Sequence, residues 1–150
     1  MEENTWSTFK EHEWHETDKD AIKSCIKQVV YASLDAFLKT GFVHGDLDWH
    51  SVLIKKTNLK EIKYSFGSVS VVKYETKFVD FEFSKFDQDV GQFFKHLKLV
   101  FMTSLIEYYS GLPFINMRAV DRLFIQTTGL YETSTDAKDV LSLLSIVDDM

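Results

Sequence analysis

Two long segments of the chain repeat apolar residues at the spacing of an amphipathic helix. Residues 18–40 and 89–109 place apolar side chains three and four positions apart, and positions at that spacing share one face of a helix. Asp18 or Asp20 can cap the first helix at its start, and Gly41 can end it in the left-handed conformation. The pattern therefore predicts two helices, the second with an apolar face wide enough for the centre of a core.

Shorter elements fill the rest of the chain. The apolar periodicity predicts short helices at residues 120–127 and 137–147, and a short helix or ordered lead-in at 8–17. Alternation of apolar and polar residues predicts strands at 52–55 and 77–82. It also predicts a hairpin at 62–72, with Gly67 and Ser68 between its two strands. Short strands bracketed by long helices, without the alternation of βαβ units, are typical of a mainly helical α+β fold.

Composition supports a single folded domain. The chain has 150 residues, of which 45% are hydrophobic and 15% aromatic. A chain of this length buries about 70% of the surface that it exposes when unfolded, which is enough for one core. We therefore expect one domain over residues 1–150, in which residues 1–19 form a polar lead-in segment.

Charge and cysteine content exclude several classes of protein. The formal net charge is -6 and the pI is about 5.3, so we expect no direct contact with nucleic acid, whose phosphates require a basic surface. Cys25 is the single cysteine, which favours a reducing, intracellular compartment. The N-terminus lacks a secretory signal pattern, and charged residues interrupt the apolar stretch 93–109, so we expect no membrane contact.

Five polar residues at characteristic spacing carry the candidate chemistry. His44 and Asp46 lie in a polar loop, Ser51 opens the next strand, Asp80 follows an apolar pair after the hairpin, and Asp89 begins the second long helix. Phosphoryl transfer needs one carboxylate near the attacking hydroxyl and a second that holds magnesium against the phosphates of ATP. The layout resembles the catalytic loop and metal-binding loop of protein kinases.

The sequence of the loop indicates which kinase families the chain resembles most. Residues 44–60, HGDLDWHSVLIKKTNLK, are similar to the haspin family of atypical Ser/Thr kinases, in which a D-L-H-W-G-N-V-L loop precedes a lysine pair and a T-x-L-K-like run. The H-G-D-L start also resembles small-molecule phosphotransferases of the aminoglycoside and choline kinase type. The similarity covers about residues 20–105. It implies the C-terminal lobe of a kinase, a histone-like substrate and a nuclear location.

The resemblance also implies a role for each site residue. Asp46 would be the catalytic base, and His44 would belong to the same catalytic loop as a scaffold residue. Asp80 and Ser51 would bind ATP through Mg²⁺. Asp89 would be a buried helix residue that holds the backbone of the catalytic loop.

Departures from the kinase pattern indicate weak or absent activity. The sequence has no glycine-rich phosphate loop, strand lysine or partner glutamate, and we expect that the N-terminal lobe is missing. Ser51 replaces the metal-binding asparagine, and Asp48 places a negative charge where the transition state needs a positive one. We therefore expect a degenerate or weakly active kinase that serves as a binding module. The alternatives are an active, minimal ATP- and Mg²⁺-dependent phosphotransferase and a fragment of a longer gene product.

The binding-module hypothesis predicts a partner. The face that an N-terminal lobe would cover should be partly apolar, and such a patch usually binds another protein or a second copy of the chain. We therefore expect a protein partner or self-association through this face.

Other patterns have simpler interpretations. His12 and His15 occur among glutamates at helical spacing, which indicates a solvated helix face more than a metal site. We expect His50 to face solvent, although it could ligate a metal beside Ser51, and Cys25 to be an inert core residue. Four lysines indicate a charged hairpin edge, with contact to phosphate or to an acidic partner as the alternative; they are Lys55, Lys56, Lys60 and Lys63.

Overall fold

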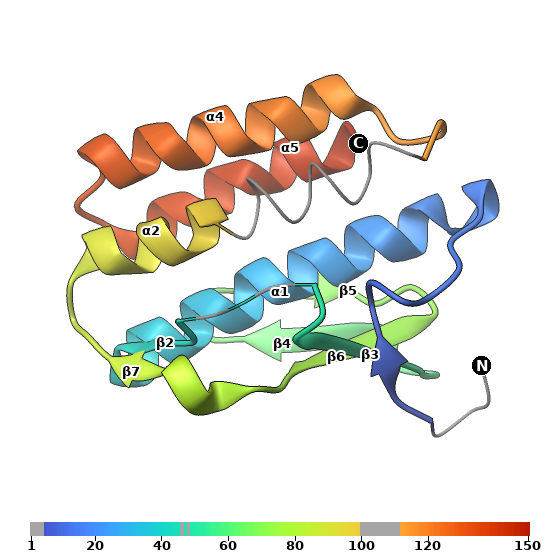
Figure 1. Ribbon diagram of the computed structural model, residues 1–150, viewed down its shortest axis with the longest axis horizontal. Coiled ribbons are helices and arrows are strands. Elements are labelled where there is room, and N and C mark those ends of the chain that lie inside the picture. The colour runs from blue at the N-terminus through green and yellow to red at the C-terminus, as the bar shows by residue number, and fades with distance from the viewer. Residues whose placement is uncertain (1–4, 46, 48, 100–111) are drawn as a thin grey trace.

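The long helix α1 (Lys19–Thr40) is the centre of the fold in the computed structural model (Figure 1). Nine hydrophobic residues along it are buried, among them Ile22, Ile26 and Leu34, none of which is exposed to solvent. One side of α1 faces the strands and the other faces a layer of helices. The helix ends as the sequence predicts, because Gly41 adopts φ 74° and donates its N–H to the carbonyl of Phe37.

The structure describes residues 5–45, 47, 49–99 and 112–150. Within these ranges the strands are β1 (Ser7–Thr8), β2 (Phe42–Val43), β3 (Val52–Lys56), β4 (Glu61–Tyr64), β5 (Gly67–Ser70), β6 (Tyr74–Phe78) and β7 (Lys85–Phe86). The remaining helices are α2 (Val90–Leu99), α4 (Met117–Thr133) and α5 (Leu144–Asp148), with the 3₁₀ helices η1 (Glu16–Asp18), η2 (Phe81–Phe83) and η4 (Ala137–Leu143). The fold is therefore α+β, as the sequence predicts.

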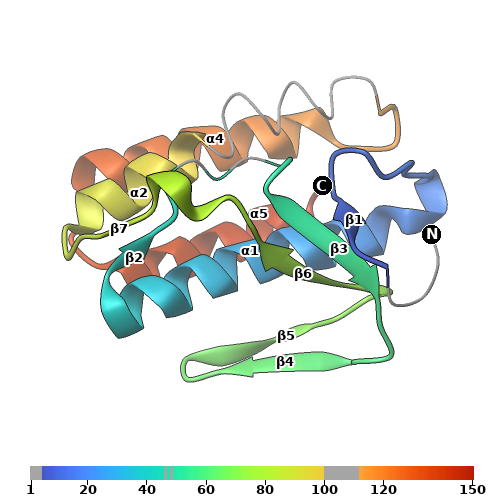
Figure 2. The same ribbon diagram turned by 60° about the horizontal axis from the view of Figure 1, so that its bottom comes forward.

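Three small antiparallel sheets lie on one side of α1 (Figure 2). The largest has the strand order β1-β3-β6, and its register places Leu53 opposite Lys77 and Lys55 opposite Glu75. The hairpin β4-β5 and the pair β2-β7 complete the set. The predicted strand at 52–55 and the hairpin are confirmed, although the turn lies at Ser65 and Phe66 rather than two residues later.

Helices α2, α4 and α5 lie together on the other side of α1 (Figure 1). The helix predicted at 120–127 is longer, because the Asn116 side chain caps it by accepting a hydrogen bond from the N–H of Arg118 at 3.1 Å. The segment predicted as a helix at 137–147 is divided between η4 and α5. Of the helix predicted at 89–109, α2 confirms the first part; residues 100–109 lie outside the described ranges.

Two predicted elements need correction. Of the two alternatives for residues 8–17, the ordered lead-in is confirmed and the helix is wrong: the segment forms the end of β1, a turn and the start of η1, and Phe9 and Trp14 pack against each other at 4.9 Å between ring centroids, both buried. The strand predicted at 77–82 begins at Tyr74 and ends at Phe78, so Asp80 stands after the strand and not inside it. The packing of Phe9 against Trp14 is a contact that the local hydrophobic pattern does not predict.

The N-terminal cap of α1 also differs from the prediction. Asp18 holds the cap position, yet its carboxylate accepts hydrogen bonds from Lys73 Nζ at 2.8 Å and from the N–H of His15 at 3.1 Å. The Asp18 side chain thus connects the start of α1 to Lys73, the residue before β6. No helix in the described part of the chain is long and apolar enough to cross a membrane.

Candidate functional site

The loop that contains His44 and the segment that contains Asp80 meet at the backbone of Val79. His44 Nε2 lies 2.6 Å from the carbonyl oxygen of Val79, and the N–H of Val79 donates to the carbonyl of Ser51 at 3.0 Å. Because a carbonyl only accepts, the His44 ring donates through Nε2 in this contact. The side chain of His44 and the backbone carbonyl of Ser51 therefore hydrogen-bond to the carbonyl and the N–H of Val79, the residue before Asp80.

A second set of contacts joins the same two segments. Strands β2 and β7 pair, with Val43 opposite Lys85. Gly45, two residues after Val43, has φ +86°, and a Cβ built on it would lie 2.1 Å from the backbone oxygen of Phe83. Only glycine fits this approach, because any side chain would collide with the backbone of η2.

Asp80 has an unusual backbone conformation at this junction. It directly follows the residue held by His44 and adopts φ 62°, ψ 62°, the left-handed region that few residues other than glycine occupy. Its carboxylate is exposed and makes no capping hydrogen bond to η2. Strained conformations of this kind cost about 1–3 kcal/mol and cluster at functional sites, where neighbouring structure holds them in place.

Asp46 and Asp48 lie outside the described residues, so the placement of the proposed base stays a prediction. The residues on either side of Asp46 are described. Gly45 contacts the backbone of η2, and the partly buried Leu47 lines a cavity together with His44. The sequence neighbours of Asp46 and of Asp80 are thus close together.

Ser51 and Asp80 offer only a sparse set of oxygen ligands. Ser51 is 4% exposed and brings a neutral hydroxyl, whereas Asp80 is exposed and brings a carboxylate. Among the described residues, no group of three or more histidine, cysteine or acidic side chains is arranged to hold a metal ion. Mg²⁺ commonly binds through one or two carboxylates together with waters and substrate phosphates. The described residues form no closed metal cage, and a shared Mg²⁺ site of Ser51 and Asp80 stays a prediction.

Asp89 differs from its expected burial. It is exposed at the start of α2, where its Oδ1 accepts a hydrogen bond from the N–H of Gly91 at 2.8 Å. Its own N–H donates to Oδ1 of Asp87 at 2.9 Å. The carboxylate therefore caps its own helix, and the predicted burial is wrong. Its support of the catalytic loop stays a prediction, because Asp46 and Asp48 are not described.

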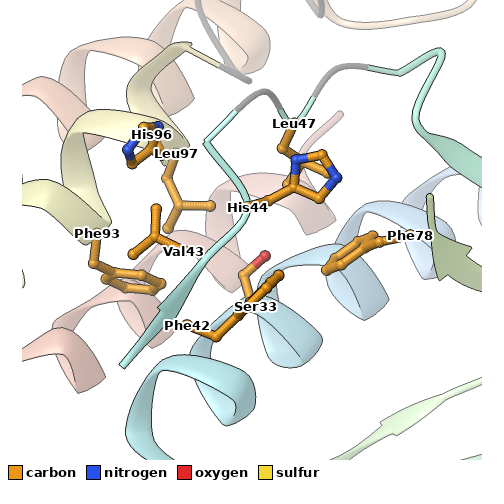
Figure 3. A pocket seen from close by; sticks show the side chains of 9 residues that line it. All are labelled: Ser33, Phe42, Val43, His44, Leu47, Phe78, Phe93, His96 and Leu97. Carbon is orange, nitrogen blue, oxygen red and sulfur yellow. The ribbon is translucent and has the colours of Figure 1, made fainter. Parts of the chain in front are cut away.

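A small, mainly apolar cavity lies behind the loop (Figure 3). It is bordered by Phe42 and His44, by Phe78 at the end of β6, and by Phe93 and His96 of α2. Within the described ranges, the buried Nε2 of His96 has no hydrogen-bond partner. Burial lowers the pKa of His96, and the nearby Lys85 and Lys95 lower it further. The cavity is too apolar to be the proposed nucleotide site. We interpret the side chains that border it as structural support for the loop.

The other candidate residues are distributed over the surface and the core. His50 is exposed, as predicted. His12 is not on a helix; its ring packs edge-on against Trp14 at 4.4 Å and against Tyr74 at 5.2 Å. Cys25 is fully buried, which confirms its place in the core, and burial raises the pKa of its thiol far above the ordinary value, which is consistent with the predicted lack of reactivity.

Sequence reasoning missed several residues that shape the site. Gly45 had a visible signal, since a glycine inside a polar loop between apolar flanks often marks a positive φ. The backbone of Val79 and the approach of Phe83 have no such signal, because they are main-chain contacts. Lys77 was also missed: it lies outside the run of lysines and approaches Trp6 only in the folded sheet.

Comparison with known proteins supports a kinase-like relationship. The chain is 34% identical over 71 residues to the serine/threonine-protein kinase haspin of Mus musculus. This alignment covers 45% of the chain and 9% of the length of the mouse protein. No family model matches the chain, and no solved structure matches it. The fold and the joined loop segments are compatible with this relationship.

Proposed function

We propose that this chain is a haspin-like, kinase-fold protein with a degenerate site, which acts mainly as a binding module. The observation that carries the proposal is the double attachment of Val79 to His44 and Ser51, beside Asp80. This arrangement brings together the two segments that a kinase uses for its base and its metal. The partial identity with mouse haspin supports the same assignment.

The proposed roles follow the positions of the residues. Asp46 would accept a proton from the attacking hydroxyl, with His44 as the scaffold residue that fixes the loop against Val79. Asp80 and Ser51 would bind Mg²⁺, and Asp89 would support the loop from the start of α2. Bound ATP would supply the phosphoryl group, and Mg²⁺ would neutralise the charge of its phosphates.

Two features of the site favour weak activity over full activity. Ser51 is buried and offers a neutral hydroxyl in place of a stronger ligand. Asp48 adds a negative charge close to Asp46 in the sequence, where positive charge would stabilise phosphoryl transfer. Each preorganised donor that such a site loses costs about 2.7–4 kcal/mol of transition-state stabilisation. Binding without rapid transfer is the expected result.

A thermal unfolding experiment tests whether ATP binds. With ATP and Mg²⁺ at 100 times the dissociation constant, binding stabilises a protein by about 2.7 kcal/mol, which raises the Tm of a chain of this size by about 5–10 °C. Asp80→Asn should abolish the Mg²⁺-dependent part of the shift. Glu82→Gln, which removes an equal charge two residues away in η2, should keep it. The absence of any shift in the parent protein would contradict the proposal.

An active, minimal phosphotransferase is the second candidate. The left-handed backbone of Asp80 supports it, because strained conformations cluster at functional sites, although Lys73 has a similar φ away from the site. Transfer from γ-labelled ATP should then occur in the parent and be lost in both Asp46→Ala and Asp80→Ala. Transfer that is undiminished in these variants would exclude the site described above.

The partner is proposed to be a protein or a second copy of the chain, docked on the surface beside Asp80. Three phenylalanines of η2 and β7 lie there and are strongly exposed: Phe81 at 50%, Phe83 at 61% and Phe86 at 72%. The histone-like substrate and the nuclear location rest on the resemblance to haspin. Sedimentation should show self-association that Phe83→Ser and Phe86→Ser weaken, or a pulldown should retain a protein that these variants lose. A monomer that retains no partner in either form would contradict the docking surface.

A further inference from the structure

Two lysines converge on one tryptophan at the outer face of the largest sheet. Lys77 Nζ lies 4.3 Å from the centre of the Trp6 ring, and Lys55 Nζ lies 5.1 Å from it. Both distances are within the range of about 6 Å over which an aromatic ring attracts a cation. Trp6 precedes β1, Lys55 belongs to β3, and Lys77 belongs to β6.

The strand register explains why these side chains meet. Val52 and Ile54 are completely buried, so alternation along β3 turns Lys55 to the opposite, outer face. Lys55 pairs with Glu75 on β6, and Lys77 is the next residue of β6 on the same face. Lys55 and Lys77 are therefore diagonal neighbours, whose separation is about 7–8 Å in a sheet of this kind.

The positive charge of this cluster is only partly compensated. Glu75 lies 3.7 Å from Lys55 Nζ, whereas Lys77 forms no ion pair within the described ranges. A tryptophan ring attracts cations but carries no net charge, so two ammonium groups and one carboxylate leave one positive charge in excess. This local excess of positive charge lies beside a partly exposed ring in a chain of net charge -6. It complements an anion.

We propose that Lys55, Lys77 and Trp6 form a binding site for the oligophosphate group of a nucleotide. Both ammonium groups lie beside the same ring, so an anion with several charged oxygens can contact both, whereas Glu75 already provides a single carboxylate to Lys55. This site goes beyond the proposed function, because it requires neither Asp46 nor a metal. It places positive charge on β6, the strand that leads to Asp80.

Calorimetry in the absence of divalent metal tests the site, with sodium tripolyphosphate, ATP and adenosine as probes. Tripolyphosphate and ATP should both bind saturably, and Lys77→Gln should weaken both by about tenfold or more, because the variant loses a charge-assisted contact to the phosphate oxygens. Lys77→Arg should retain the affinity. Lys56→Gln removes the same charge from the same strand and should change the affinity by less than about twofold, as for an exposed charge without a direct contact.

Tryptophan emission locates the bound anion. Trp49 is completely buried and Trp14 is 5% exposed, whereas Trp6 is partly exposed, so an emission change on titration with tripolyphosphate should disappear in Trp6→Phe. Three results would overturn the inference: no saturable binding of tripolyphosphate, equal losses in Lys77→Gln and Lys56→Gln, or adenosine that binds as tightly as ATP. Because no metal and no phosphoryl transfer are involved, a failure here leaves the test of the proposed function untouched.

Discussion

Replacing Gly45 with alanine should strongly destabilise the protein. Gly45 has φ +86°, and an added Cβ would lie 2.1 Å from the backbone oxygen of Phe83 and 2.8 Å from its carbonyl carbon. The positive φ costs about 1–3 kcal/mol for a residue with a side chain, and overpacking against rigid backbone costs about 1–3 kcal/mol more. We therefore expect Gly45→Ala to lower the free energy of unfolding by about 2–6 kcal/mol.

Gly129 provides a matched control with the opposite sign. It lies inside α4, and a Cβ built there meets no atom within 4 Å. Because alanine favours a helix over glycine by about 0.5–1 kcal/mol, Gly129→Ala should stabilise the protein by about that amount. Urea unfolding with a shared m-value measures both changes. If Gly45→Ala is as stable as the parent, the close contact between the loop and η2 is wrong.

Three further predictions follow from individual contacts. His44→Ala removes the hydrogen bond to Val79 and should cost about 1–3 kcal/mol of stability in urea unfolding; an unchanged midpoint would show that the ring does not hold the segment. Burial pushes the pKa of Asp18 upward, but the hydrogen bond from Lys73 and the one from the backbone leave the pKa below its ordinary 3.8. The stability that this pair contributes is therefore present above pH 3.8 and is lost as the pH falls through the lowered pKa, and Asp18→Asn should flatten that part of the stability profile. Cys25 should resist a thiol-reactive dye in the native protein and react on unfolding, because burial raises the pKa of its thiol; rapid labelling of the native protein would contradict its place in the core.

The helices were the most predictable part of the fold. The spacing of Ile22, Ile26 and Leu34 predicts which side of α1 is buried, and Gly41 predicts where the helix ends. Both features could therefore be inferred from the local sequence. The first residues after β1 could not be inferred in this way. Phe9 packs at 4.7 Å against Trp49, forty positions further along the chain, and this distant contact replaces the expected helix.

The candidate site was predictable in its side chains but not in its main-chain contacts. The spacing of His44, Ser51 and Asp80 predicted two segments that meet, and the hydrogen bonds at Val79 bring the segments together. A backbone carbonyl has no sequence signal, so the meeting point could not be named in advance. The exposure of Asp89 was missed for a related reason: an aspartate at the start of a helix can cap that helix or serve a distant loop, and the sequence is the same in both cases.

The central claim is that the loop around Asp46 and the segment around Asp80 form one metal-binding site. Titration with Mn²⁺, followed by amide NMR, measures this directly, because a bound paramagnetic ion broadens the resonances of nearby residues. We expect the resonances of Gly45, Asp46 and Asp80 to broaden together at low Mn²⁺ while that of Gly129 does not, and we expect Asp80→Asn to remove the effect. Broadening that is confined to one of the two segments, or that first appears elsewhere in the chain, would contradict it.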